Sequence, residues 1–113
     1  MVHAVVAVIK PHRLEDVKEA LKGIGVSGLT VTEVKGFGRQ GGHTETYRGA
    51  EYEVDLIPKV RVECLCASPD ADKVIDTIAG AARTGTIGDG KLWAYPVDRV
   101  VRVRTGERDV EAL

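Results

Sequence analysis

The sequence lacks both an excess of basic residues and a long apolar run, and each absence excludes a class of protein. Its 113 residues include 16 Lys and Arg against 17 Asp and Glu, and this net charge of −1 argues against a nucleic-acid-binding domain of the usual basic type. No apolar run approaches the ~18 residues that span a bilayer. The N-terminal residues MVHAVVAVIKPH have neither a basic start nor a small-residue cleavage site, so we expect no signal peptide.

Cysteine is also scarce, since only Cys64 and Cys66 occur. On the strand expected there, both side chains point to the same face, which is a poor geometry for a disulfide. No other Cys or His lies near enough in the sequence to complete four metal ligands. We therefore expect two small buried side chains in a reducing compartment.

Hydrophobic periodicity divides the chain into two β-α-β units. Strands are expected at residues 3–9, 29–34, 60–66, 92–95 and 100–103. Helices are expected from Leu14 to about Gly25 and from Pro69-Asp70 to Ala82, after the pattern of their apolar residues. Two such units in one domain spanning residues 1–113 predict an α+β fold, the ferredoxin-like βαββαβ sandwich, with both helices on one face of an antiparallel sheet.

The first strand is apolar on both faces. Val5, Ala7 and Ile9 alternate with Ala4, Val6 and Val8 along residues 3–9. The helices of such a sandwich cover only one face of its sheet, so the other face needs either a partner or, as the weaker alternative, the short tail of the chain folded over it. We therefore predict a homo-oligomer.

Three patterns favour phosphate binding, although none is sufficient alone. Residues 84–91, TGTIGDGK, resemble a P-loop but leave a helix and enter a strand, so they form either an anion-binding nest or a simple glycine turn. Residues 36–41 spell G-x-G-x-x-G without a following helix, which excludes a dinucleotide fingerprint. Arg102 and Arg104 would lie side by side on a strand, where two guanidiniums suit a polyphosphate or simply a charged edge.

The segment between residues 36 and 58 is polar and has no apolar periodicity of its own. We expect it to be a long functional loop, because structureless loops of this length are uncommon in compact domains. Tyr47 and Tyr52 are expected at its tip, where a tyrosine suits partner contact or covalent modification.

Three separated stretches together resemble the PII signal-transduction family, the trimeric nitrogen and carbon sensors of bacteria, archaea and plastids. The stretches are GFGRQGGHTETYRGAEY from Gly36, TGTIGDGKLW from Thr84 and VRVRTGE from Val101. The resemblance covers nearly the whole chain, and the coincidence of all three stretches is highly specific. It implies a homotrimer with a T-loop at about 37–58, a B-loop at about 84–91 and a C-loop at about 102–108.

The resemblance further implies that ATP or ADP binds between two subunits, with the B-loop of one and the C-loop arginines of the next around the phosphates. One subunit would supply Gly36, Phe37, Gly38, Arg39, Gln40, Gly88, Asp89, Gly90 and Lys91. The neighbouring subunit would supply Thr30, Glu63, Arg102 and Arg104.

A second effector, 2-oxoglutarate, is implied together with Mg²⁺. Gln40 would ligate the Mg²⁺ along with ATP phosphates, and the metal would chelate the keto acid. The 2-oxoglutarate site would comprise Gly38, Arg39, Gln40, Gly41 and Lys59, in which Lys59 pairs with the distal carboxylate.

The implied protein is cytoplasmic and regulates nitrogen metabolism through its T-loop. Its partners would be an ammonium channel, which would bring it to the membrane, or enzymes and regulators of nitrogen metabolism. A nucleotidylyltransferase would uridylylate or adenylylate Tyr52. Three departures stand out: Gly41 and Thr86 replace lysines that the family often carries, and Ala50 replaces a serine that is phosphorylated in some members.

An enzyme is the weaker alternative. The chain has no Asn, which argues against an acylphosphatase-like site, and only one of its three histidines, His43, lies near a candidate phosphate site. A small phosphotransferase, a trimeric metal- or nucleotide-binding protein without 2-oxoglutarate sensing, and an interaction module without ligand stay open as alternatives. We expect no catalytic residues.

Overall fold

The structure is a computed structural model that describes residues 1–38, 43–47, 50–54 and 56–113, with side chains for 1–38 and 56–113. Its strands are β1 (Val2–Ile9), β2 (Thr30–Gly36), β3 (His43–Tyr47), β4 (Ala50–Val54), β5 (Ile57–Ala67) and β6 (Lys91–Val97). Its helices are α1 (Leu14–Gly23) and α2 (Ala71–Ala82), with 3-10 turns η1 (Pro11–Arg13), η2 (Ser68–Asp70) and η3 (Asp109–Ala112).

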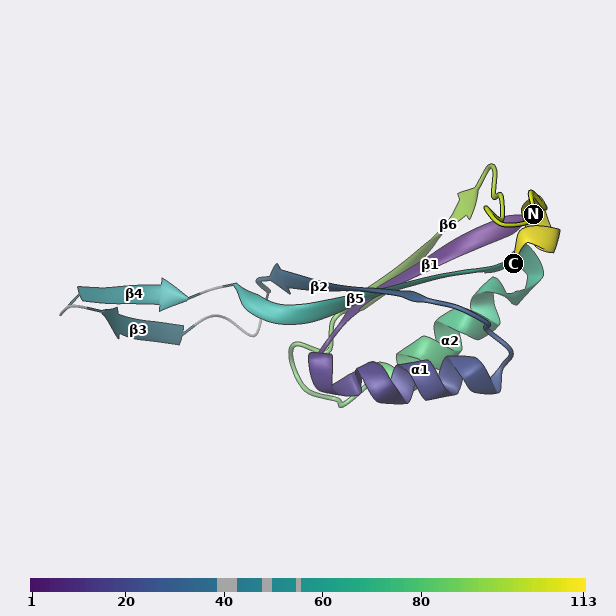
Figure 1. Cartoon of the computed structure of the whole chain (residues 1–113). Coiled ribbons are helices and arrows are strands. Elements are labelled where there is room, and N and C mark those ends of the chain that lie inside the picture. Colours follow the sequence, from purple (N-terminus) through teal and green to yellow (C-terminus); the bar gives the residue numbers. More distant parts are fainter. Residues whose placement is uncertain (39–42, 48–49, 55) are drawn as a thin grey trace.

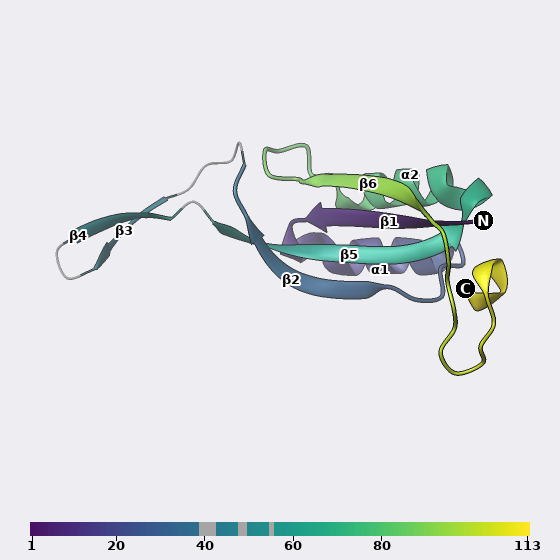
Figure 2. The same ribbon diagram turned by 90° about the horizontal axis from the view of Figure 1, so that it is seen from above.

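Four strands form the main sheet in the order β2-β5-β1-β6, and every neighbouring pair is antiparallel. Both helices cover one face of this sheet (Figures 1 and 2). The expected α+β ferredoxin-like sandwich is thereby confirmed. No helix in the described part of the chain is long and apolar enough to cross a membrane.

The core lies between the sheet and the helices, where alternation along the strands places the apolar side chains. From β1 it takes Val5, Ala7 and Ile9; from β5 it takes Val60, Val62, Cys64 and Cys66; from the helices it takes Val17, Leu21, Val74, Ile78 and Ala82. Both cysteines are free thiols, as expected. Burial raises the pKa of the Cys64 thiol to about 11.

The opposite face of the sheet keeps apolar side chains in contact with solvent. Leu65, Trp93 and Tyr95 are 39%, 46% and 42% exposed on it. Beneath them Val6, which pairs with Glu63 and Trp93, is buried by these long neighbours. The two-faced apolar character expected of β1 is therefore present, and the homo-oligomer that it implies stays a prediction.

The expectation of an unstructured loop between residues 36 and 58 is wrong in part. Strands β3 and β4 pair as an antiparallel hairpin that projects from the end of the sheet (Figure 1). Of the two tyrosines expected at the tip, Tyr47 belongs to the last described pair of the hairpin, with Ala50, and Tyr52 lies two positions further along β4, opposite Glu45. A hairpin can form from polar residues, which leave no apolar period to read.

The strand expected at residues 100–103 is absent, and with it the side-by-side placement of Arg102 and Arg104. Only Val101 bridges, to Arg108, because the chain reverses at Gly106, whose φ is +75°. The segment thus pairs with itself instead of joining the sheet, and Arg104 lies in the turn.

Candidate functional site

The B-loop joins α2 to β6 at the end of the sheet from which the hairpin projects (Figure 2). Gly85, Gly88 and Gly90 all have positive φ, at 86°, 97° and 94°, a conformation that other residues adopt at a cost. A Cβ on Gly90 would overlap the carbonyl oxygen of Val8 in β1. The glycines of this motif therefore allow the loop to dock directly on the sheet.

Asp89 organises the B-loop from within. Its carboxylate accepts hydrogen bonds from the backbone N–H groups of Thr84 and Gly85, both at 2.9 Å, and from the Thr84 hydroxyl. The Lys10 ammonium, at the end of β1, lies 3.2 Å from the same carboxylate. These bonds, with those from Thr84 first, lower the pKa of Asp89 well below its usual range and keep the carboxylate ionised.

Lys59 connects the B-loop to strand β5. Its side chain is buried, with the residue 8% exposed, and its ammonium donates a 2.6 Å hydrogen bond to the Gly88 carbonyl. A buried charge is normally paired with an opposite one. Among the described residues no carboxylate lies within ion-pair distance of Lys59, and its one described partner is the neutral carbonyl of Gly88.

A groove of about 550 Å³ opens between the B-loop and the end of β2. It brings together eight of the residues implied by the resemblance, which are Gly36, Phe37, Gly38, Lys59, Gly88, Asp89, Gly90 and Lys91. Val8, Thr86, Ile87 and Trp93 complete its lining. Arg39, Gln40 and Gly41, expected here as well, lie outside the described residues.

Thr30, the first residue of β2, pairs with Glu63 near the middle of β5, and both line a second pocket of about 500 Å³ together with Ala112 and Leu113. The Glu63 carboxylate accepts a 3.1 Å hydrogen bond from the Tyr95 hydroxyl, which raises the pKa of Tyr95. These two expected site residues therefore lie on the face of the sheet that carries Tyr95.

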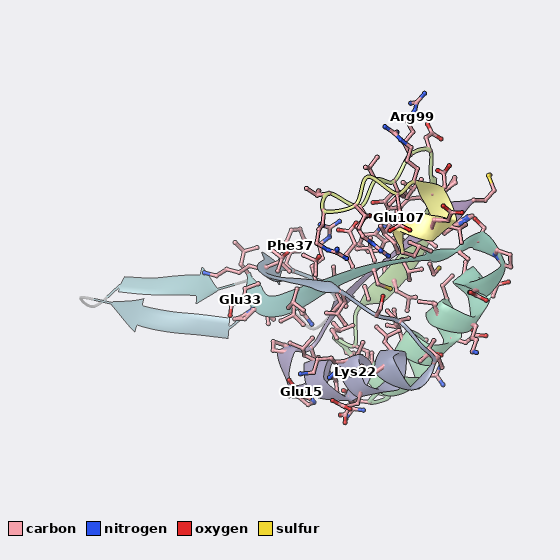
Figure 3. All side chains as sticks on the ribbon, turned by 45° about the vertical axis from the view of Figure 1, so that its right-hand side comes forward. Glu15, Lys22, Glu33, Phe37, Arg99 and Glu107 are labelled. Carbon is pink, nitrogen blue, oxygen red and sulfur yellow. The ribbon has the colours of Figure 1, made fainter. Side chains whose placement is uncertain are left out.

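The C-loop lies beside this second pocket. Arg102 pairs with Glu107 at 2.9 Å and donates to the Leu113 carbonyl. Arg104 is exposed and forms no hydrogen bond or ion pair within the described residues. Figure 3 shows Glu107 and Arg99 in the C-terminal segment, away from Phe37 at the root of the hairpin.

One chain thus separates the implied nucleotide residues into two groups. Thr30 and Gly36 are six positions apart along β2, which corresponds to about 20 Å. Within one chain these two groups of residues therefore lie at different places along the sheet.

Sequence reasoning placed Thr84 in the B-loop but missed Lys10 and Trp93 as residues of this region. Lys10 is 74 residues from Thr84 along the sequence, and only the fold brings them together. The sequence could have indicated Trp93, because it follows Lys91 by two positions on a strand and therefore lies on the same face.

The groove combines features that suit an anion, and its one described carboxylate, Asp89, is already paired with Lys10. It has glycines that allow close backbone approach and two lysines, Lys59 and Lys91. No group of three His, Cys, Asp or Glu side chains that could hold a metal occurs in the part of the chain that the structure describes.

Comparison with known proteins gives one consistent match. The profile of the family described as "Nitrogen regulatory protein P-II" matches residues 2–107. The chain is 57% identical to "Nitrogen regulatory protein P-II" of Rhizobium etli over 109 residues, which covers 96% of this chain and 97% of the relative. It is equally identical to "Nitrogen regulatory protein P-II" of Klebsiella oxytoca and "Nitrogen regulatory protein P-II 1" of Escherichia coli K12, each over 107 residues, 95% of this chain and 96% of the relative.

Proposed function

The chain belongs to the nitrogen regulatory protein P-II family, and from this premise we propose that it senses ATP, ADP and 2-oxoglutarate at clefts between the subunits of a homotrimer. The family consists of signal-transduction regulators of nitrogen metabolism, and this chain is such a regulator and not an enzyme. The proposal adds to that role the ligands, the assembly and the residues.

The proposed nucleotide site combines both ends of the sheet. The B-loop backbone and Lys91 hold the phosphates, while Arg104 and Arg102 of the next subunit close over them. Thr30 and Glu63 of that subunit contact the rest of the nucleotide. The two groups of residues are about 20 Å apart along β2, which supports a site shared by two subunits. The exposed side chains of Leu65, Trp93 and Tyr95 also support the assembly, because a trimer interface would cover them.

The observation that carries the proposal is the buried Lys59. Its ammonium lies in the wall of the groove, with a neutral carbonyl as partner and no carboxylate within ion-pair distance in the described chain. An anionic ligand in the groove would pair with this ammonium, and the distal carboxylate of 2-oxoglutarate is the proposed partner. Gly38, Arg39, Gln40 and Gly41 complete the proposed site, in which Mg²⁺ bound with ATP and Gln40 supplies the attraction for the keto acid.

The T-loop is the proposed output element. Its hairpin projects from the sheet directly beside Gly36 and Lys59, so ligands in the groove lie at its root (Figure 1). We assign to it contact with an ammonium channel or with enzymes and regulators of nitrogen metabolism in the cytoplasm. Tyr52 in β4 is the proposed residue for uridylylation or adenylylation by a nucleotidylyltransferase.

Calorimetric titration tests the scheme. ATP and ADP should compete for one site per subunit, and 2-oxoglutarate should bind only when Mg²⁺ and ATP are present. Lys59→Met should abolish 2-oxoglutarate binding while the protein still binds ATP, because its ammonium pairs with the carboxylate. Equal binding of 2-oxoglutarate with ADP, or to the Lys59→Met protein, would contradict the sensing scheme.

A further inference from the structure

We propose that Lys10 is a positioning residue that fixes the shape of the B-loop for phosphate binding, and that Thr86 completes its set of acceptors. The inference rests on the proposed nucleotide site and deepens it. Lys10 comes from the other half of the chain and is absent from the lining of the groove.

The contacts of Lys10 match its chemistry. A lysine ammonium has three N–H donors. In this structure it has three partners, which are the Thr84 hydroxyl at 3.0 Å, the Thr86 hydroxyl at 2.5 Å and the Asp89 carboxylate at 3.2 Å. Every donor is therefore used within the B-loop, and none is left for a ligand.

The same contacts order the loop around a single point. Asp89, which is paired with Lys10, in turn accepts hydrogen bonds from the backbone N–H groups of Thr84 and Gly85. The Lys10 side chain is 19% exposed and that of Asp89 is 25% exposed, so water screens this pair only in part. Together with the contact of Gly90 on Val8, Lys10 joins the start and the end of the loop to β1.

Thr86 distinguishes the B-loop of this chain, because its hydroxyl can accept a hydrogen bond from Lys10. Lysine, which the family often carries at this position, has no acceptor to offer Lys10 and would place a second ammonium beside it. Threonine supplies a hydroxyl that accepts from Lys10 and also bonds to the Thr84 hydroxyl at 2.8 Å. The loop thereby gains order where it loses a cation.

Lys10→Met tests the inference, with Lys22→Met as a matched control because Lys22 is exposed and lies 3.7 Å from a single carboxylate. The single tryptophan, Trp93, lines the groove and serves as a fluorescence reporter of binding. Lys10→Met should raise the Kd for both ATP and ADP by roughly tenfold, since a loop that must order on binding loses affinity. The ratio of the two Kd values should not change, and Lys22→Met should bind like the wild type.

Hydrogen exchange separates positioning from general stability. In the Lys10→Met protein without nucleotide, the amides of Thr84 and Gly85 should exchange faster, ATP should restore their protection, and the amides of α2 should be unaffected. Faster exchange throughout α2 and the sheet would show a merely structural role and overturn the inference.

A second variant, Thr86→Val, keeps the shape of the side chain but removes the hydroxyl, and Thr86→Ser restores it. We expect the Kd for ATP to rise by roughly threefold in Thr86→Val and to stay near the wild-type value in Thr86→Ser. Because Thr86 is exposed, this pair decides the question even if Lys10→Met does not fold. Unchanged affinity, or a changed ratio of ATP to ADP affinity, would overturn the inference, whereas failure of the wild-type protein to bind either nucleotide would overturn the proposed function itself.

Discussion

The B-loop and the C-loop lie at opposite ends of the same sheet and are held in different ways. The B-loop is bonded to Lys10, which directly follows β1, and to Lys59 from β5, and its Gly90 lies against the backbone of Val8. The C-loop is bonded to its own neighbours, chiefly through Arg102 and Glu107. The B-loop is thus ordered by the core of the fold, while the C-loop is ordered locally.

This difference bears on the site proposed between subunits. In that proposal the loop that approaches phosphates through its backbone has a fixed shape, because small displacements there would lose several bonds together. The loop that would supply long arginine side chains is held by fewer contacts with the sheet and could adapt to a neighbouring subunit and a ligand.

The largest effect is expected when variants of the two ends are mixed. Homogeneous Gly90→Ala protein, and homogeneous protein with both Arg102→Ala and Arg104→Ala, should each lose roughly hundredfold or more in ATP affinity. Unfolding the two proteins together and refolding the mixture should restore wild-type affinity at a fraction of the sites, since an intact B-loop then meets an intact C-loop in each mixed trimer. Titration of Trp93 fluorescence measures this fraction.

Light scattering is the control for the mixing experiment, and it should give a mass of three chains for each variant. If mixing restores no binding while the assembly is intact, both groups of residues serve one chain alone, and the comparison of the two ends loses its meaning.

Replacing one glycine in each loop should show the difference between the B-loop and the C-loop in the free energy of unfolding. Gly90→Ala should lower the free energy of unfolding by more than about 2 kcal/mol, because the strain of positive φ adds to the overlap with Val8. Gly106→Ala in the C-loop has the same kind of φ but open space around it, so about 1 kcal/mol is expected. Urea unfolding measures both, and equal losses would show that the B-loop is not docked on β1 as described.

The carboxylate of the B-loop, Asp89, should matter more for ATP affinity than that of the C-loop, Glu107. Asp89→Asn should weaken ATP binding several-fold, whereas Glu107→Gln should change it little, because an exposed ion pair such as Arg102–Glu107 contributes at most about 1 kcal/mol. Calorimetric Kd values for the two variants provide the test, and a larger effect of Glu107→Gln would reverse the roles of the loops.

The pH dependence of B-loop order follows from the lowered pKa of Asp89. A depressed pKa in the folded state stabilises the loop at any pH above the ordinary value of 3.8 and loses that contribution as the pH falls further. Protection of the Thr84 and Gly85 amides should therefore be the same at pH 7 and pH 5. Loss of protection between these values would show that the carboxylate is not held as the structure describes.

The smallest expected effect is the dependence of stability on the ionisation of the buried thiols. Because the pKa of Cys64 rises from 9.0 to about 11 on folding, the folded state keeps a proton that the unfolded state loses, and stability should fall as the pH rises through this interval. At pH 8 the native protein should react only slowly with a thiol reagent, while the unfolded protein reacts at both cysteines. Rapid labelling of Cys64, which borders the pocket beside Leu113, would indicate that the C-loop end opens more readily than described.

Much of the fold could be predicted from periodicity. The apolar spacing from Leu14 and from Val74 indicated the two helices, and alternation in β1 and β5 indicated the buried strands. The hairpin of β3 and β4 was not predicted, because its strands consist largely of polar residues and have no apolar alternation to indicate them. The strand expected at Val100–Val103 was wrong because alternation says nothing of whether a neighbouring strand is available to pair.

The site could be predicted only in part. The glycines and Lys91 form a contiguous motif that sequence can show, and the structure brings them together with Lys59 and Phe37. The role of Lys10 could not be read from the sequence, because its partners lie at least 74 residues away and no local pattern links them.

The position of β1 in the sheet also has a consequence for biosynthesis. This strand is made first, yet its two partners are β5 and β6, the latter ending at Val97. Contacts between segments so far apart in sequence form slowly, and a nascent chain must leave β1 without its neighbours until most of the polypeptide has emerged from the ribosome. The B-loop, which docks on the end of β1, is therefore among the last parts to take shape, and a chain that ends before β6 would lack the groove described here.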